Sequence, residues 1–417
     1  TGDSDVSLSM TCIDPNTGYV LAMIGGRDWS DSQFNLATSA TGRQAGSSFK
    51  AFTLAAAIEQ GISPKTVIDC STGFVNAAWS KPVTNYAGAN YGYLSIERMT
   101  WVSANTGFAR LVTDPDGVTP QSLLDMAARL GVAGDTKYGY GAYPALTLGA
   151  AQTNTLRMAS AYGAFATGGI RHADTCITQV IAQDGTTLID NTEVPGEQVL
   201  SPEVAGEVTR VLQGVVTQGT GRGSALPSGQ VSAGKTGTSQ EHRDLWFCGY
   251  TPQLSCAVWT GAAQEREMWE APWCKDAWRI FMSLALDGRE RQDFPSAAEP
   301  NYDSAFNKKQ SVYSEDAAKD TIARLSGASL AEVQAALGNN LTIVETYSPT
   351  VAAGSIVKIE FANGTYIAYV SIGPDPNAGG EGDGAGSGEE PPGGGEGPTE
   401  PPDDGGQPGG EGGEPAP

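Results

Sequence analysis

Ser47 and Lys50 stand three residues apart at the start of an apolar stretch that runs to about residue 60. Because a serine hydroxyl has a pKa far too high to attack a carbonyl at neutral pH, it needs a neighbouring base. The chain holds only two histidines among 417 residues, so a lysine amine is the best candidate for that base. The spacing therefore predicts a nucleophile and its base on one face of a helix.

Taken alone, this pair is a weak signal, since a helix N-cap serine followed by an exposed lysine has the same spacing. Two further groups strengthen it. Ser103 and Asn105 lie downstream, and Lys235 opens the sequence Lys-Thr-Gly-Thr on a predicted strand. Each group is unremarkable by itself, but chance does not readily produce all three in this order.

The chemistry of these groups is mutually consistent. Lys50 acts as a base only when neutral, which requires burial or a nearby cation to lower its pKa, and Lys235 can supply that cation. Gly237 removes a side chain from the strand, so that a peptide substrate can lie against the backbone. Thr236 and Thr238 add hydroxyls suited to a substrate carboxylate. We therefore expect a serine acyl-transfer site.

The elements that must position these residues are strands near both ends of a first domain and helices between them. Alternating patterns predict a hairpin over residues 6–13 and 19–24, and strands over 231–238, 245–250 and 254–259. Helices are predicted over 49–60 and 155–167, and from capping positions 119 and 201 to about 130 and 216. The predicted fold is α+β, an antiparallel five-stranded sheet flanked by helices.

Composition divides the chain into a first domain over 1–305, a polar linker over 306–314, a small α+β module over 315–373 and a tail over 374–417. In the module, Ser329 and Glu332 form a capping box that predicts a helix to residue 337. Strands are expected over 341–346, 356–361 and 366–372, with a turn at Asn363 and Gly364. The tail is Gly- and Pro-rich, with eleven acidic residues and no Lys or Arg, so we expect it to be disordered.

The net charge of −22 argues against a nucleic-acid partner, whose phosphates would be repelled. No apolar stretch approaches the roughly 20 residues needed to span a bilayer, so we expect any membrane anchor upstream of this sequence. The six cysteines lack the spacing of a zinc site, and either disulfides or buried free thiols fit them. They are Cys12, Cys70, Cys176, Cys248, Cys256 and Cys274.

The three groups around Ser47, Ser103 and Lys235 match the signature of penicillin-binding proteins and serine β-lactamases. Over about residues 5–300 the sequence resembles the transpeptidase domain of class A, bifunctional penicillin-binding proteins. The stretches that carry the resemblance are 43–50, 85–86, 148–150, 158–162, 219–221, 233–238 and 244–247. Alanine stands at Ala45 and Ala51, where that family usually has proline.

The resemblance implies a D,D-transpeptidase that cross-links peptidoglycan stem peptides through an acyl-enzyme on Ser47, and that β-lactams acylate and inhibit. By this likeness Lys50 takes the serine proton, and Ser103 relays a proton to the departing D-Ala. Asn105 holds the donor peptide. The terminal carboxylate binds at Lys235, Thr236 and Thr238, and the substrate lies against Gly237. The backbone N–H groups of Ser47 and Thr238 form the oxyanion hole.

The resemblance also implies binding partners, a cellular location and further domains. The expected partners are a D-Ala-D-Ala donor, an amine acceptor and β-lactams, with cell-wall assembly proteins as further candidates and no cofactor or metal. The expected location is the extracytoplasmic face of a bacterial membrane, with an anchor and a glycosyltransferase domain upstream. Residues 327–337 and 347–354 resemble a PASTA module, which implies either contact with muropeptides or β-lactams or a structural appendage.

Three rival functions share this site. A serine β-lactamase of the common class needs a glutamate in a Glu-x-x-Leu-Asn sequence, and no such sequence occurs here. A D,D-carboxypeptidase differs only in using water as the acceptor. A non-enzymatic β-lactam sensor is acylated and then signals. The last two stay open as alternatives.

Overall fold

The computed structural model describes residues 5–30, 32–39, 41–133, 136–262, 264–269, 271–310, 315–337, 341–362 and 365–376. The chain divides into two units, residues 1–373 and 374–417. Almost all of the second unit lies outside the described residues, and so does the predicted turn at residues 363–364. The prediction of a disordered tail is therefore not addressed by the structure.

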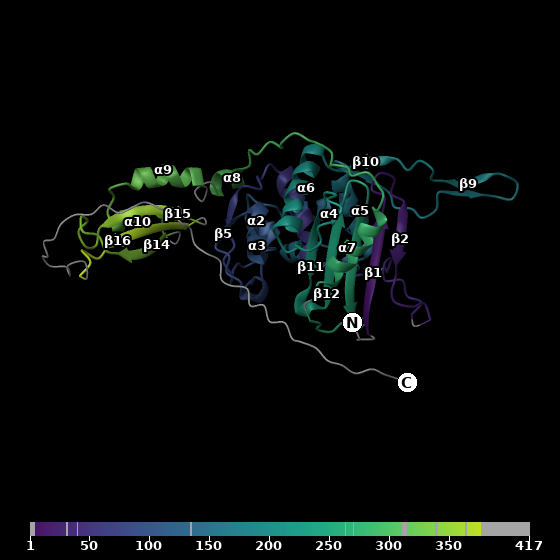
Figure 1. Cartoon of the computed structure of the whole chain (residues 1–417), viewed down its shortest axis with the longest axis horizontal. Coiled ribbons are helices and arrows are strands. Elements are labelled where there is room, and N and C mark those ends of the chain that lie inside the picture. Colours follow the sequence, from purple (N-terminus) through teal and green to yellow (C-terminus); the bar gives the residue numbers. More distant parts are fainter. Residues whose placement is uncertain are drawn as a thin grey trace, which may run out of the picture. The chain divides into compact units, whose positions relative to one another are not determined.

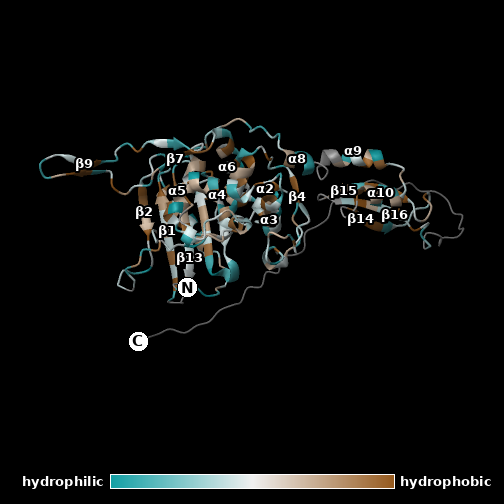
Figure 2. Cartoon of the chain, turned by 180° about the vertical axis from the view of Figure 1, so that it is seen from behind, coloured by the Kyte–Doolittle hydropathy of each residue, from teal (hydrophilic) through white to brown (hydrophobic). Residues whose placement is uncertain are grey.

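A five-stranded antiparallel sheet forms the centre of the first domain (Figure 1). Its strand order is β11-β12-β13-β1-β2, which confirms the predicted hairpin, the predicted three later strands and the α+β class. The strands are β1 (Val6–Ile13), β2 (Val20–Ile24), β11 (Ala233–Thr238), β12 (Asp244–Tyr250) and β13 (Ser255–Ala262). The strand that carries Lys235 is thus an edge strand, and the apolar strand β2 forms the other edge (Figure 2).

Alternate residues of the sheet face two separate hydrophobic cores. On one face, Trp246 and Tyr250 of β12 join the core that contains helices α1 (Lys50–Glu59), α5 (Thr155–Ala166) and α6 (Pro202–Thr217). On the other face, Leu245 and Phe247 pack with α7 (Trp273–Ala285). Helix α7 was not predicted, although Cys274, Trp278 and Met282 recur every fourth residue and are all buried, which is the pattern of a packed helix.

The predicted helix starts are confirmed by their caps. Thr119 accepts a hydrogen bond from the backbone N–H of Ser122 at the start of α4 (Pro120–Arg129), and Ser201 does the same for Val204 in α6. Helix α1 is buried at every position from Lys50 to Ile58 and lies between α4 and α6. A buried helix of this kind holds its first residue in a fixed position, and that residue is Lys50.

Two short helices frame the sequence Ser-Ala-Asn. They are α2 (Ile96–Trp101) and α3 (Asn105–Thr113), and neither was predicted. Helix α2 packs on α6, and the Trp101 indole donates to the carbonyl of Val211 at 2.9 Å. The turn between the two helices therefore has a firm position relative to the core.

Residues 306–310, the first part of the predicted linker, lie in helix α8 (Ala305–Gln310). Phe306 is buried in the core that contains α1, and the Asn307 side chain bonds Ser63, Thr66 and Gly61. This stretch is mostly polar, but its one large apolar residue, Phe306, is buried. Part of the expected linker is therefore packed onto the first domain. Residues 311–314 lie outside the described residues, and the domain boundaries stay predictions.

The small module is α+β. It contains helices α9 (Glu315–Leu325) and α10 (Leu330–Leu337) and strands β14 (Leu341–Thr346), β15 (Ile356–Ala362) and β16 (Thr365–Ser371). The capping box is present, since the Ser329 amide and hydroxyl both donate to Glu332. The strand order is β14-β16-β15, with β14 and β16 parallel. The likeness to a PASTA module stays a prediction. Among the described residues of the chain, no helix is long and apolar enough to cross a membrane.

Candidate active site

Two buried lysine amines meet at one serine hydroxyl. The Lys50 amine donates to the Ser103 carbonyl at 2.7 Å, to the Ser103 hydroxyl at 3.3 Å and to Asn105 Oδ1 at 2.8 Å. The Lys235 amine donates to the same Ser103 hydroxyl at 2.9 Å and to the Thr236 carbonyl at 3.2 Å. Residues separated by more than 180 positions thus converge on Ser103, as the sequence order suggested.

Burial sets the charge state of these amines. Both lysines are 0 % exposed, and among the described residues no carboxylate pairs with either of them. Burial, and secondly the nearby charge of Lys235, lower the pKa of Lys50 well below its usual value of 10.5. Burial also lowers the pKa of Lys235 to about 7. Near neutral pH at least one amine can therefore be unprotonated and act as a base.

Ser47 lies in a single 3-10 turn, η1 (Gly46–Phe49), which leads directly into α1. In such a turn residues three apart eclipse one another, so Ser47 and Lys50 share a face. Ser47 is half-buried, whereas its neighbour Ser48 is fully buried and its hydroxyl donates to the Ala45 carbonyl at 2.7 Å. Of the two adjacent serines, only Ser47 is placed to meet a ligand.

Glycines let three segments close around this turn. A Cβ on Gly46, whose φ is +54°, would lie 2.5 Å from the Thr238 carbonyl oxygen. A Cβ on Gly149, whose φ is +72°, would lie 2.1 Å from the Gly46 oxygen. The edge strand β11 thus runs against the Ser47 turn, and the backbones of Ser47 and Thr238 are neighbours. Ala45, where the family usually has proline, donates its N–H to the Ala151 carbonyl at 3.3 Å, a bond that proline cannot make.

Gly237 makes room for a neighbouring turn, and not for a peptide substrate as the sequence suggested. A Cβ there would lie 2.6 Å from the Ala45 carbonyl oxygen and 3.0 Å from the Ser48 nitrogen. The space saved by this glycine is therefore filled by the Ser47 turn and not by a peptide substrate. Gly237 permits β11 to approach the Ser47 turn at backbone distance.

The two threonines of β11 are half-buried and alternate along the strand with the buried Lys235 and Gly237. The Thr236 hydroxyl shares a 2.7 Å hydrogen bond with the Thr220 hydroxyl, and the Thr220 amide donates to the Trp101 carbonyl at 2.9 Å. Lys275 of α7 donates to the Thr220 carbonyl at 3.2 Å. Lys275 was not singled out from the sequence, and Thr220 was named only within the stretch 219–221 that carries the resemblance, with no role given to it. Thr220 stands between two glycines, which is the local signal for a tight turn beside another strand.

Backbone strain and a buried asparagine position the Ser103 side of the site. Ser103 has a φ of +60°, which a non-glycine residue rarely adopts. Asn105 donates its side-chain amide to the Thr84 carbonyl at 2.9 Å. Asn85 is buried and donates to the Cys70 carbonyl at 2.8 Å while its Oδ1 accepts from Thr106. The Thr84 segment therefore forms a wall beside Asn105.

Asp244 is a structural residue. Its carboxylate pairs with Arg43 at 2.8 Å and accepts hydrogen bonds from Trp259 at 3.0 Å and Ser239 at 2.8 Å. Both sides of the ion pair are largely buried. The pair ties the segment before Ser47 to the start of β12, beyond the end of β11.

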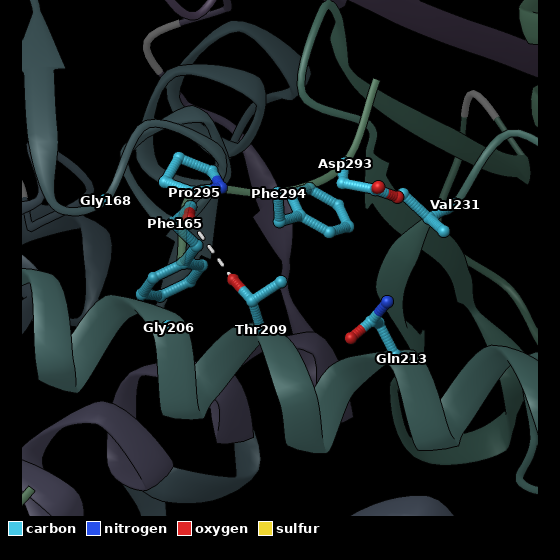
Figure 3. Close-up of a pocket in the computed structure, with 9 residues that line it drawn as sticks. All are labelled: Phe165, Gly168, Gly206, Thr209, Gln213, Val231, Asp293, Phe294 and Pro295. Atoms are coloured by element: carbon cyan, nitrogen blue, oxygen red, sulfur yellow. Dashed lines mark hydrogen bonds between the residues drawn. The ribbon is translucent and has the colours of Figure 1, made fainter. Parts of the chain in front are cut away.

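The cysteine thiols and the residues lining one cavity contribute no hydrogen bond to the two lysine amines. All six cysteines are free, and five are buried, which fits the thiol alternative; burial raises the pKa of Cys70 and Cys274 to about 12. A cavity of about 250 Å³ lies between Phe165, α6 and the segment 293–295 (Figure 3). It contains none of the predicted site residues, and Thr209 within it donates to the Phe165 carbonyl at 3.2 Å.

The antiparallel sheet, with a lysine-bearing edge strand set against a serine turn, defines the class of penicillin-binding proteins and serine β-lactamases. Within that class, the chain belongs to the penicillin-binding protein transpeptidase family, whose domain description it matches over residues 8–264. This confirms the family expected from the sequence motifs.

Relatives and solved structures agree with that assignment. The chain is 33 % identical over 323 residues to penicillin-binding protein 1A of Mycobacterium tuberculosis, covering 71 % of this chain and 38 % of that protein. It is 34 % identical over 322 residues to the same-named protein of Mycolicibacterium smegmatis, covering 71 % and 40 %. The chain thus spans less than half the length of these relatives.

Among solved structures, the chain is similar to PonA1 of Mycobacterium tuberculosis in complex with penicillin V. The TM-score is 0.64 and the identity 31 %, over 72 % of this chain and 84 % of that one. A D,D-transpeptidase domain of a peptidoglycan glycosyltransferase from Eggerthella lenta has the same fold, with a TM-score of 0.57 and 24 % identity over 68 % of this chain and 79 % of that one.

The lowered pKa of Lys235 predicts how stability depends on pH. Between about pH 7 and 10.5 the unfolded chain binds more protons at this lysine than the folded chain does. The contribution of Lys235 to the free energy of unfolding should therefore increase as the pH rises through that window, by up to about 1.4 kcal/mol per pH unit. The same contribution is lost as the pH is lowered to about 7.

The measurement is urea unfolding of the native chain and of Lys235→Met at pH 7, 8 and 9. We expect the native chain to gain stability relative to the variant as the pH rises. Parallel pH profiles would show that Lys235 is not held in a pKa-lowering site.

Proposed function

We propose that this domain is a D,D-transpeptidase that cross-links peptidoglycan stem peptides through an acyl-enzyme on Ser47. One observation carries the proposal: two buried lysine amines share the Ser103 hydroxyl beside the turn that presents Ser47. Burial of both amines makes a neutral base available to a serine nucleophile, which is the central requirement of this chemistry.

In the acylation step, the Ser47 hydroxyl attacks the carbonyl between the two terminal D-alanines while Lys50 takes its proton. The tetrahedral intermediate then breaks its C–N bond. Ser103, hydrogen-bonded to both amines, passes its proton to the departing nitrogen and takes one in turn from the protonated Lys50, so that D-alanine leaves with a neutral amine and Lys50 is again neutral. The donor peptide remains as an ester on Ser47. The shared Ser103 hydroxyl supports this relay, since it joins the two bases in one network.

In the second step, the amine of another stem peptide attacks the ester carbonyl. A new amide bond forms, the serine oxygen leaves, and the proton of the attacking amine returns to Ser47 through Lys50. Two stems are then cross-linked and the enzyme is regenerated. A D,D-carboxypeptidase would follow the same course with water in place of the amine.

The proposed contacts to the donor follow the walls of the site. The backbone N–H groups of Ser47 and Thr238 form the oxyanion hole, and the close approach of Gly46 to Thr238 supports this pairing. The terminal carboxylate binds at the hydroxyls of Thr236 and Thr238, with Lys235 behind them. Asn105 holds the acyl amide of the donor. Because β11 is an edge strand, the backbone groups on its outer side make no hydrogen bonds to β12 and are available to the donor peptide.

β-Lactams should acylate the same serine, because they present a strained carbonyl and a carboxylate at comparable separation. The mycobacterial structure in complex with penicillin V supports this part of the proposal. The substrate places the domain at the extracytoplasmic face of the membrane, where peptidoglycan is assembled. Polymerisation of glycan strands would need a further domain and is not proposed for residues 5–376.

The first prediction of this proposal concerns the nucleophile. Incubation with benzylpenicillin should add the full mass of the drug to the native chain, because the ring opens without losing atoms. Ser47→Ala should abolish the adduct, and Ser48→Ala, which loses hydrogen bonds to the Ala45 carbonyl and the Cys248 thiol, should keep it. Intact-protein mass spectrometry makes the comparison. Absence of an adduct on the native chain would refute the proposal.

The second prediction concerns the base. Lys50→Ala should lower the acylation rate by about 10²–10⁴-fold, the usual contribution of a general base. Its thermal unfolding should still be cooperative. Lys65→Ala is the matched control, because this lysine is 74 % exposed and should leave the rate unchanged. Fast acylation of a folded Lys50→Ala chain would mean that another group accepts the serine proton.

A further inference from the structure

Two surface turns meet over the site through one tyrosine and one histidine. The Tyr86 hydroxyl and His242 Nε2 lie 3.1 Å apart and share a hydrogen bond. Their rings pack edge to face, with centroids 5.6 Å apart and an angle of 84° between the planes. Tyr86 begins the turn η2 (Tyr86–Gly88), and His242 ends the turn η5 (Gln240–His242).

Each turn is the outer end of one wall of the site. On one side, Thr84 and Asn85 directly precede Tyr86, and the Thr84 carbonyl accepts the hydrogen bond from Asn105. On the other side, η5 follows β11 after Ser239, which is bonded to the buried Asp244. Both walls are therefore held firmly up to the point where the Tyr86–His242 contact joins them.

Unusual backbone conformations gather at the same place. Among the described residues, four that are not glycine have φ between +50° and +60°. One is Ser103, and the other three lie in the two turns: Ala87, Glu241 and His242. Such conformations are costly and persist where the surrounding structure enforces them, which is most often at ligand sites. The contact between the turns is thus a constrained feature and not a chance meeting of surface side chains.

We propose that Tyr86 and His242 form a clasp that selects donors by the size of the group attached to the acyl amide. This inference rests on the function proposed above. The proposed function places the ligand carboxylate at Thr236 and Thr238, its reacting carbonyl at Ser47 and its acyl amide at Asn105. The substituent on that amide must then extend out of the site between the two walls. The clasp spans that exit, so a bulky group has to open it and a ligand without that group does not.

The size of the effect follows from what the clasp is made of. It consists of one hydrogen bond between partly exposed side chains and one edge-to-face ring contact. Each is worth only a modest free energy at a protein surface. Removing the clasp should therefore speed acylation by bulky ligands roughly threefold to tenfold, and leave small ligands unaffected.

Two β-lactams with the same ring system make the test. Benzylpenicillin carries a phenylacetyl group on its amide nitrogen, and 6-aminopenicillanic acid carries a free amine there. The second-order rate of Ser47 acylation is measured with both, for the native chain, Tyr86→Phe, His242→Ala and the double variant. Tyr19→Phe and His172→Ala are matched controls, since these residues also make surface hydrogen bonds but lie on other elements.

We expect the rate with benzylpenicillin to rise threefold to tenfold in His242→Ala, which removes both contacts, and no further in the double variant; Tyr86→Phe, which loses the hydrogen bond but keeps the ring contact, should give a smaller rise. The rate with 6-aminopenicillanic acid should not change. An unchanged or lower benzylpenicillin rate, or an equal change with both ligands, would overturn the clasp while leaving acylation of Ser47 intact. Failure of the native chain to react with either ligand would overturn the proposed function and the clasp together.

Discussion

The structure depends on the burial of two lysine amines around one serine hydroxyl. A buried ammonium is expensive unless its hydrogen bonds are satisfied or its proton is lost. Here the carbonyls of Ser103 and Thr236 and the amide oxygen of Asn105 satisfy the donors, and no carboxylate among the described residues neutralises the charge. The remaining cost is relieved by lowering the pKa of the amines, and a neutral amine is what a serine nucleophile needs. Stability and chemistry are therefore set by the same burial.

The rest of the domain keeps this group of side chains together. Helix α1 is buried along nearly its whole length, so Lys50 at its first position cannot move toward solvent. Three glycines allow β11, the Ser47 turn and the segment around Gly149 to approach at backbone distance. The pair Arg43 and Asp244 then ties the chain before Ser47 to the start of β12. Each of these contacts joins segments that are far apart in the sequence.

Local patterns were sufficient to predict the sheet, helices α1, α4, α5 and α6 and the caps of α4 and α6, whereas α7 was missed. The residues of the proposed site could also be picked out, because Ser47, Ser103 and Lys235 each sit in a short sequence of fixed spacing, and the fold brings Lys50, Ser103 and Lys235 together. Other features have no local pattern. Gly237 lies against Ala45 only because the fold brings together residues that are nearly 200 positions apart. In the same way, Tyr86 contacts His242 across 156 positions of the sequence. Helix α8 was taken as a linker because its composition is polar, and one phenylalanine decides its position.

The most direct test of the account is turnover of a peptide ending in D-Ala-D-Ala, with and without an amine acceptor, followed by mass spectrometry of the products. The account predicts release of D-alanine together with a cross-linked product when the acceptor is present, and loss of both with Ser47→Ala. Release of D-alanine with only the hydrolysed peptide, whatever the acceptor concentration, would contradict it and identify a carboxypeptidase.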